Sequence, residues 1–293
     1  MSLEQLEELR IKARNRKILI GIISTVVVIG FFILSIILNV RAVGYLGIIL
    51  SGVIGSALYA PIKNYSAQYK ETFVETELKN SFDNLIYQPF EGISKDIISN
   101  TGMMKMGNVY DSNDYIEADY NGVHFKQADV SIAQQTRNGK TTLFKGRWMI
   151  FDFNKEFKTN MQVVHKSFPN SANPNNIIFN RPDLRYETVK VENENFNNAF
   201  VIRSQNELNT YYILTPHLME KMLQVSSEIG RRMMFCFINN QLYVAIYTGT
   251  DSFENSAYHK LDPQKEKEGI IKDIALITSF VDELNLDRKI FKE

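Results

Sequence analysis

Cysteine is almost absent from this chain of 293 residues, in which Cys236 is the only one. A lone cysteine excludes an intramolecular disulfide framework. Cys236 stands inside the apolar run 233–238, and no local motif supplies the base that a nucleophile would need. We therefore expect a small buried hydrophobic residue in a reducing compartment rather than a nucleophile.

The chain also lacks net charge, with 33 basic and 33 acidic residues. Residues 1–62 hold six basic and three acidic residues, which leaves 27 basic and 30 acidic residues elsewhere and a net charge near −3 there. Nucleic-acid binding requires a concentrated positive surface. The composition therefore predicts that nucleic acid is not a partner.

Motifs for catalysis or cofactor binding are missing as well. The sequence has no nucleophile elbow, Gly-rich phosphate loop or dinucleotide fingerprint. A calcium-like opening at 111–114 lacks the glycine and the glutamate that the loop needs, since Ile116 and Gly122 stand there. The histidines do not stand at metal-ligand spacing. We expect no catalytic, cofactor-binding or metal residues, and we favour a protein that is not an enzyme. The four histidines are His124, His165, His217 and His259.

Charge is absent from two long apolar runs, 18–38 and 42–62, and this absence identifies them. Each would reach about 31 Å as a helix, which matches a bilayer core of about 30 Å. A cleaved signal peptide has a shorter apolar region, and the buried helices of soluble proteins rarely stay uncharged on every face. The sequence thus predicts a transmembrane hairpin whose tip is residues 39–41.

Basic residues indicate the orientation of this hairpin. A cluster of five precedes the first run, Lys63 and Lys70 follow the second, and the tip has only Arg41. The positive-inside rule then places both termini in the cytoplasm, at the inner cell membrane. The cluster could also attract anionic lipid headgroups, although a role in topology alone is the more common one. Its members are Arg10, Lys12, Arg14, Arg16 and Lys17.

Small residues recur in the second run at a spacing of four, at Gly47, Ser51 and Gly55. This spacing lets helix backbones approach closely. Packing within the hairpin is the favoured interpretation, and a dimer interface is the alternative. Neither run contains an ionisable residue, so a proton or ion path through them is not expected.

The remainder predicts an α+β fold with a mostly antiparallel sheet. An N-terminal segment (1–17) and the hairpin (18–62) precede amphipathic stalk helices at 63–100, with a first helix reaching Leu85, and a soluble domain at 101–293. Alternation from 114 to 166 predicts an antiparallel meander, with turns at 121–122 and 138–139 and a bulge between 125 and 128. Residues 167–183 indicate an irregular loop.

Later segments carry clear start and stop signals. Thr215 and Pro216 predict the start of a helix that ends at Gly230. Residues 233–238 and 242–247 flank 239–241 as a hairpin, and Asp262 with Pro263 opens a last helix.

One strand of the meander carries three basic residues around the only tryptophan, at Lys145, Arg147 and Lys155. They could form a basic face for a ligand. A solvated strand face is the more frequent reason for such a pattern.

Several short motifs, in order along the chain, resemble a bacterial family of membrane proteins known only as a domain of unknown function. The resemblance implies a two-span N-terminal hairpin, a cytoplasmic α+β domain and a bacterial origin, and it implies no catalytic residues. The motifs are Tyr87-Gln88-Pro89, Gly92-Ile93-Ser94, Phe144-Lys145-Gly146, Phe200-Val201-Ile202-Arg203-Ser204 and Leu214-Thr215-Pro216.

Two hypotheses about function follow. The first is a non-enzymatic binding or regulatory module that the hairpin holds at the inner membrane face, with a protein partner. The second is an enzyme or binder that acts on lipid-linked substrates near the bilayer. A pore or transporter subunit is the least favoured.

Overall fold

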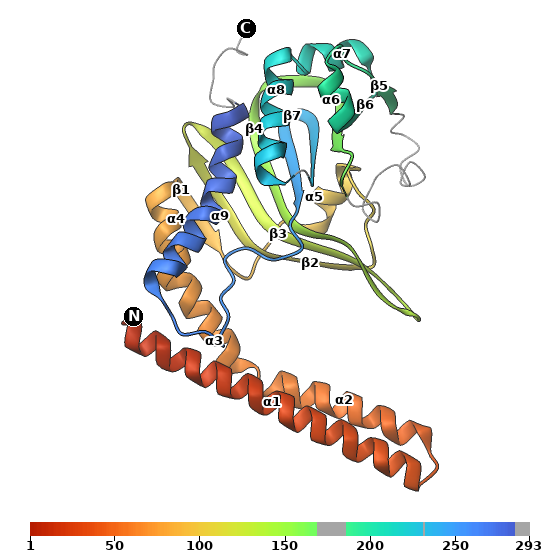
Figure 1. Ribbon diagram of the computed structural model, residues 1–293, viewed down its shortest axis with the longest axis vertical. Coiled ribbons are helices and arrows are strands. Elements are labelled where there is room, and N and C mark those ends of the chain that lie inside the picture. The colour runs from red at the N-terminus through yellow and green to blue at the C-terminus, as the bar shows by residue number, and fades with distance from the viewer. Residues whose placement is uncertain (169–185, 231, 285–293) are drawn as a thin grey trace. The chain divides into compact units, whose positions relative to one another are not determined.

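The computed structural model describes residues 1–168, 186–230 and 232–284. The chain divides into two compact units. Unit 1 comprises Met1–Thr76 with Glu254–Ile270, and unit 2 comprises Glu77–Phe253 with Ile271–Glu293. Helices build unit 1, and an antiparallel sheet with helices builds unit 2 (Figure 1), so the α+β class is confirmed.

Unit 1 is built on a pair of antiparallel helices, α1 (Leu3–Ile37) and α2 (Arg41–Ala57), which lie side by side in Figure 1. The turn between them contains Asn39 with a φ of 52°, a left-handed conformation that asparagine tolerates. Because α1 begins at Leu3, the N-terminal segment and the first apolar run form one continuous helix.

α1 is long and apolar enough to cross a membrane, judged by length and composition. The second expected span differs from a straight helix over 42–62, because α2 ends at Ala57 and the helical chain from Ala60 to Ser81 follows at a bend of 44°. Pro61 lies in the first turn of α3 (Ala60–Tyr69) and has no N–H for a continuous helix, which explains the break. A second span exists only if the bent pair acts as one.

A segment from far along the chain completes unit 1. We name residues 254–262 the strap. Its Ala257 carbonyl accepts a hydrogen bond of 2.6 Å from Arg10 Nη1, and Glu7 Oε2 accepts one of 3.3 Å from the N–H of Leu261. Lys70 pairs with Glu254 at 2.9 Å. These contacts fix the strap against α1 and against the π-helical turn η1 (Lys70–Val74).

The stalk helices end earlier than the sequence indicates. After η1, α4 (Glu75–Ser81) is followed at once by strand β1 (Asp83–Gln88), so the expectation of a helix through Leu85 was wrong. β1 pairs with β2, and this long-range pairing overrides the local helical periodicity.

All strands of the sheet pair antiparallel, in the order β1-β2-β3-β4-β6-β5, with β7 also paired to β4. The first predicted turn is confirmed, since Asn121 and Gly122 both have positive φ angles. The second turn was predicted at 138–139, but it lies at 137–138, because Thr136 pairs with Gly139. The strands after β1 are β2 (Val109–Tyr120), β3 (Val123–Thr136), β4 (Gly139–His165), β5 (Glu187–Val189), β6 (Phe200–Ser204) and β7 (Met233–Tyr247).

The expected bulge in β3 was wrong, because the extra residue lies in β2. Between Asn113 and Ile116 the register of β2 shifts against β3, and Asp114 adopts a φ of 56°. β3 pairs with β4 without a break from Phe125 to Ile132. The change of parity arises instead because β3 is buried on both faces from Gln127 to Val130.

β7 folds back on itself, as the sequence predicts. The N–H of Tyr247 donates to the carbonyl of Arg232 at 2.9 Å, so the two arms lie side by side, and Asn239 at the turn has a φ of 55°. The arm 241–247 pairs with 146–152 of β4, and the arm 234–237 pairs with 161–164. The two halves of β4 therefore flank the β7 hairpin, and Figure 1 shows β4 curving around it.

Helices and short segments cover both faces of the sheet. Phe280 of α9 (Pro263–Leu284) contacts Phe151 and Phe235 on one face, where Figure 1 also shows α8 (Pro216–Ile229). The opposite face buries Trp148 with residues 93–104, which include α5 (Lys95–Asn100). The remaining helices are α6 (Glu194–Ala199) and α7 (Glu207–Ile213).

The predicted ends of α8 and the start of α9 are confirmed. The Thr215 side chain accepts from the N–H of Leu218, and Gly230 ends α8 with a φ of 95°. α9 begins at Pro263, with Asp262 before it. The loop expected at 167–183 lies, from residue 169 onward, outside the described residues.

We predict that Gly47→Ala destabilises the α1–α2 hairpin, whereas Gly52→Ala does not. A Cβ atom on Gly47 would lie 2.5 Å from Cβ of Phe31, and a Cβ atom on Gly52 would meet no atom within 4 Å. Overpacking costs about 1–3 kcal/mol, whereas a strain-free glycine-to-alanine change gains about 0.4–1 kcal/mol. Thermal unfolding of the full chain in detergent, followed by circular dichroism, measures both; equal effects would contradict the packing.

Candidate functional site

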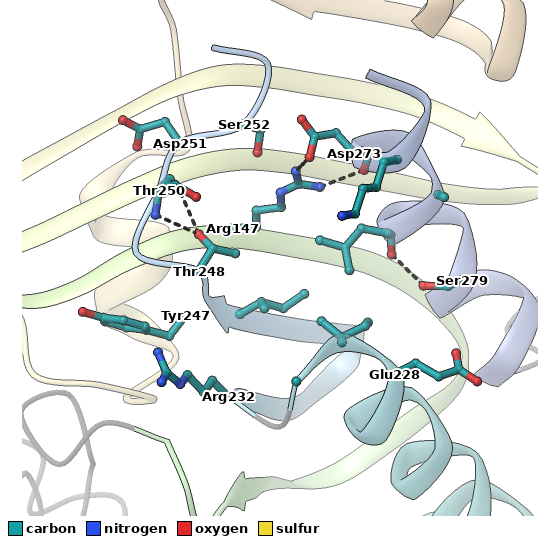
Figure 2. Close-up of a pocket in the computed structure, with 16 residues that line it drawn as sticks. Arg147, Glu228, Arg232, Tyr247, Thr248, Thr250, Asp251, Ser252, Asp273 and Ser279 are labelled. Atoms are coloured by element: carbon teal, nitrogen blue, oxygen red, sulfur yellow. Dashed lines mark hydrogen bonds and ion pairs between the residues drawn. The ribbon is translucent and has the colours of Figure 1, made fainter. Parts of the chain in front are cut away.

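A pocket of about 870 Å³ opens in unit 2 beside the second arm of β7. Its walls are the C-terminal end of α8, the loop that follows β7 and one side of α9, with Arg147 of β4 at its base (Figure 2). The polar residues that line it are Arg147, Glu228, Arg232, Thr248, Thr250, Asp251, Ser252, Lys272, Asp273 and Ser279.

Arg147 and Asp273 point toward each other across this base (Figure 2). Arg147 Nη1 donates to the Asp273 carbonyl at 2.7 Å, and its other terminal nitrogen forms an ion pair with the Asp273 carboxylate. The second carboxylate oxygen accepts from the N–H of Phe253 at 3.1 Å. Only 5% of Arg147 is exposed. A buried guanidinium needs such compensation, so this pair fixes α9 and the end of the loop to β4.

Asp129 of β3 holds the same loop from the other side. Its carboxylate is fully buried and accepts two hydrogen bonds from Ser252, one from the hydroxyl at 2.7 Å and one from the backbone N–H. Burial, with a smaller contribution from the neighbouring Asp114, raises the pKa of Asp129 to about 7, although the Ser252 hydrogen bonds and Arg147 act to lower it. The group therefore changes charge near neutral pH.

The loop 248–253 is tied down along its whole length. Lys145 Nζ pairs with Asp251 at 2.9 Å, and the Lys145 carbonyl accepts the N–H groups of Thr248 and Gly249. Gly146 permits the close approach, because a Cβ atom there would lie 2.0 Å from the Ile246 carbonyl oxygen. The pocket wall is thus preorganised rather than assembled on binding.

Two cations at the rim have no side-chain partner among the described residues. Arg232 precedes β7, Lys272 lies on α9, and both are exposed. The acids Asp251 and Asp273 are already paired with Lys145 and Arg147. The rim can therefore bind an acidic group by charge-assisted hydrogen bonds.

The three basic residues singled out on β4 are placed differently from one another. Lys145 pairs with Asp251, Arg147 is buried on Asp273, and Lys155 lies on β4, but its side chain is outside the described part of the structure. A basic face made of the three stays a prediction.

The three small residues of α2 differ in how closely they approach α1. Gly47 is buried against Phe31, a Cβ atom on Gly55 would lie 3.7 Å from Ile20, and the Ser51 hydroxyl donates to the Ile48 carbonyl of its own helix.

The residues of the N-terminal basic cluster differ in exposure and in their partners. Arg10 is buried and pairs with Glu7, Lys12 is exposed, and Arg14 and Arg16 are half-buried. Lys17 lies over the Tyr258 ring.

Cys236 is fully buried, as the sequence predicts, and burial raises the pKa of its thiol. Its surroundings are apolar side chains of the sheet core. Within residues 1–168, 186–230 and 232–284, no group of three His, Cys, Asp or Glu side chains could hold a metal ion.

Sequence reasoning missed Asp129, Ser252 and Asp273. Asp129 carries a usable signal, because it is a charged residue between Ala128 and Val130 in a strand with burial on both faces. A carboxylate there must find donors. Its donors come from a loop more than a hundred residues later, which no local pattern reveals.

A family model matches part of the chain, and its description names no activity. Residues 142–286 match a family described as a protein of unknown function (DUF3137). An uncharacterised family is thereby confirmed at this coarse level, while the hairpin and the motifs at 87–94 lie outside the matched residues. No curated protein matches the chain significantly.

One solved structure is similar to the chain, that of the mycobacterial trehalose monomycolate transport factor A, TtfA. The two share 10% identity with a TM-score of 0.38, over 75% of this chain and 94% of that one. At this score the similarity carries no argument about function.

We predict that Asp129→Asn removes a pH dependence of stability. Below pH 7 the folded protein keeps the Asp129 proton, which the unfolded chain releases near pH 3.9, so stability falls as pH rises from about 4 to about 7 and then levels off. The fall amounts to roughly 2–4 kcal/mol. Urea unfolding across this range measures the slope; Asp251→Asn should keep it, and an unchanged slope in Asp129→Asn would refute the assignment.

Arg147→Met and Lys145→Met form a matched pair on β4. We expect Arg147→Met to lower the free energy of unfolding by roughly 2–4 kcal/mol, because it leaves Asp273 without its cation. Lys145→Met removes a pair whose members are each about one-third exposed, and should cost less than about 1 kcal/mol. Urea unfolding at neutral pH compares them, and similar losses would count against a central role for the Arg147 pair.

Proposed function

We propose that the protein is a membrane-anchored binding module. The hairpin of α1 and the bent α2–α3 segment holds it in the bilayer, and unit 2 presents a site for an acidic group of a partner protein. The observation that carries the proposal is the apolar surface of the hairpin. No residue in the most apolar 18-residue stretch of α1 is buried.

This surface needs an apolar environment. The core helix of a soluble protein buries its apolar stripe, and soluble monomers rarely expose continuous apolar patches beyond a few hundred Å². Exposure to water costs about 25 cal/mol per Å². A bilayer removes this cost for both helices. Exposed side chains of the pair include Ile22, Val26, Ile29, Phe32, Ile36, Leu46, Ile49 and Val53.

The flanking charges support a cytoplasmic site. Lys12, Arg14, Arg16 and Lys17 precede the apolar stretch of α1, and only Arg41 stands at the turn between the helices. Basic flanks stay on the cytoplasmic side. In this orientation both termini, and with them unit 2, lie at the inner face of the membrane.

The pocket suits binding better than catalysis. Arg232, Thr250 and Lys272 on its walls are exposed, so water is not excluded, and a reaction would gain little from its electrostatics. Asp273 and Arg147 are held by each other. Arg232 and Lys272, which have no side-chain partner in the described part of the chain, instead favour an acidic partner at this preorganised rim.

An enzyme or binder for lipid-linked substrates is the second candidate. The Ser252 hydroxyl donates to a buried carboxylate with a pKa near 7, an arrangement that can move a proton. Ser252 itself is 3% exposed, which limits substrate access and leaves this candidate second.

We predict that reversing the rim charges abolishes partner binding. The full chain, solubilised from membranes, should retain a specific protein partner; Arg232→Glu with Lys272→Glu should lower the bound amount about tenfold or more, because two attractive charges become repulsive. Quantitative affinity purification measures this.

Lys140→Glu is the matched control, since Lys140 is an exposed cation of unit 2 away from the pocket. It should bind the partner as the wild type does. Equal loss in the control, or no loss in the double variant, would contradict the pocket as the binding site. A chain that alkaline carbonate releases from membranes would contradict the anchor.

A further inference from the structure

The strap brings residues from late in the chain to the point where the apolar stretch of α1 begins. Lys17 Nζ lies 5.8 Å from the centroid of the Tyr258 ring, and Ile18 is the next residue of α1. Arg10 holds the neighbouring Ala257 by its carbonyl. Tyr258 therefore lies beside the side chain of the last charged residue before the apolar stretch.

The strap is anchored by its buried residues and displays its exposed ones. Ala257 and Leu261 are buried, whereas Tyr258 is 56% exposed and His259 and Lys260 are also exposed. A tyrosine, a histidine and a lysine are thus adjacent on a segment whose backbone is hydrogen-bonded to side chains of α1.

The end of α2 reaches the same level. A Cβ atom on Gly55 would lie 3.7 Å from Ile20 Cγ2, so these positions face each other across the hairpin. Tyr59, 53% exposed, lies four residues beyond Gly55 in the break between α2 and α3, and is therefore near the level of Lys17. Two exposed tyrosines and a lysine share one level of unit 1.

Three acidic residues of unit 1 near this level are paired with cations, and Glu266 accepts a hydrogen bond from the Tyr69 hydroxyl. Glu7 is paired with Arg10 at 2.7 Å, Glu254 with Lys70 at 2.9 Å, and Asp262 lies 3.8 Å from Lys265. The half-buried Lys17 and the exposed Lys260 therefore remain for contact with anionic lipid.

We propose that the strap is a second membrane contact: Tyr258, His259 and Lys260, together with Lys17 and Tyr59, lie in the headgroup layer and bind anionic phospholipid. The inference rests on the proposed anchoring of the hairpin. Tyrosine is enriched at this depth because its ring is apolar and its hydroxyl is polar. A lysine near an anionic membrane surface is attracted to it electrostatically.

A tryptophan at position 258 tests the depth. The chain has one tryptophan, Trp148, which is fully buried in unit 2. We would reconstitute the full-length Tyr258→Trp variant in liposomes with brominated phospholipids and subtract the emission of the parent chain. Keeping Trp148 avoids a core substitution. The expected result is strong quenching by lipids brominated near the headgroup and weaker quenching by lipids brominated near the chain ends.

Two reference positions separate failure of the strap from failure of the anchor. Phe32→Trp, in the apolar stretch of α1, should be quenched by deep bromines, and Tyr212→Trp, exposed on α7 of unit 2, should not be quenched. Quenching at position 32 without quenching at 258 overturns the strap contact and leaves the anchor intact. Absence of quenching at 32 overturns the anchor and the strap contact with it.

Lipid charge is tested in the same variant. With bromine on phosphatidylglycerol rather than on phosphatidylcholine, quenching at position 258 should be a few-fold greater at equal mole fraction. Lys17→Gln with Lys260→Gln should lower the ratio, whereas Lys140→Gln, which removes an exposed cation of unit 2, should keep it. A ratio of one in the parent variant overturns the anionic preference.

Discussion

The constraint on which unit 2 depends is the pairing of both halves of β4 with one hairpin. Residues 146–152 pair with the second arm of β7, and residues 161–164 pair with the first. β4 itself pairs with β3 and with β6 and so joins the meander to the short strands β5 and β6, while the β7 hairpin ties its two halves to each other. The loop that leaves β7 must then pass over the start of β4, where Lys145, Arg147 and Asp129 hold it and form the pocket wall.

Features governed by neighbouring residues could be predicted from the sequence. The turn at 121–122, the Thr215 cap and the Gly230 stop need only local backbone preferences. β1 and the β2 bulge at Asp114 could not, because the partner strand decides them. The pocket was hidden for the same reason, since its base joins Arg147 to Asp273 across 126 residues. The apolar runs were visible because bilayer thickness acts on contiguous sequence.

The matched family region contributes to both units. Residues 142–286 contain most of β4, all of β7 and the pocket, but also the strap, which belongs to unit 1. They exclude β3, which lies along the first half of β4 and carries Asp129. The matched region is thus not a free-standing half of the molecule. Its strand β4 needs β3 as a partner, and its loop 248–253 needs Asp129, and both partners come from before residue 142.

The nesting of β7 inside β4 also orders events during synthesis. The meander from β1 to the first half of β4 can pair as it leaves the ribosome, since each strand follows its neighbour. The edges of both halves of β4 that later pair with β7 emerge unpaired: residues 161–164 stay so until about 70 further residues have been made, and residues 146–152 stay so for longer. Chaperone recognition and misassembly of the nascent chain should therefore concentrate on the unpaired edges of β4. Hydrophobic residues such as Val163, which are buried in the folded protein, are exposed there during synthesis.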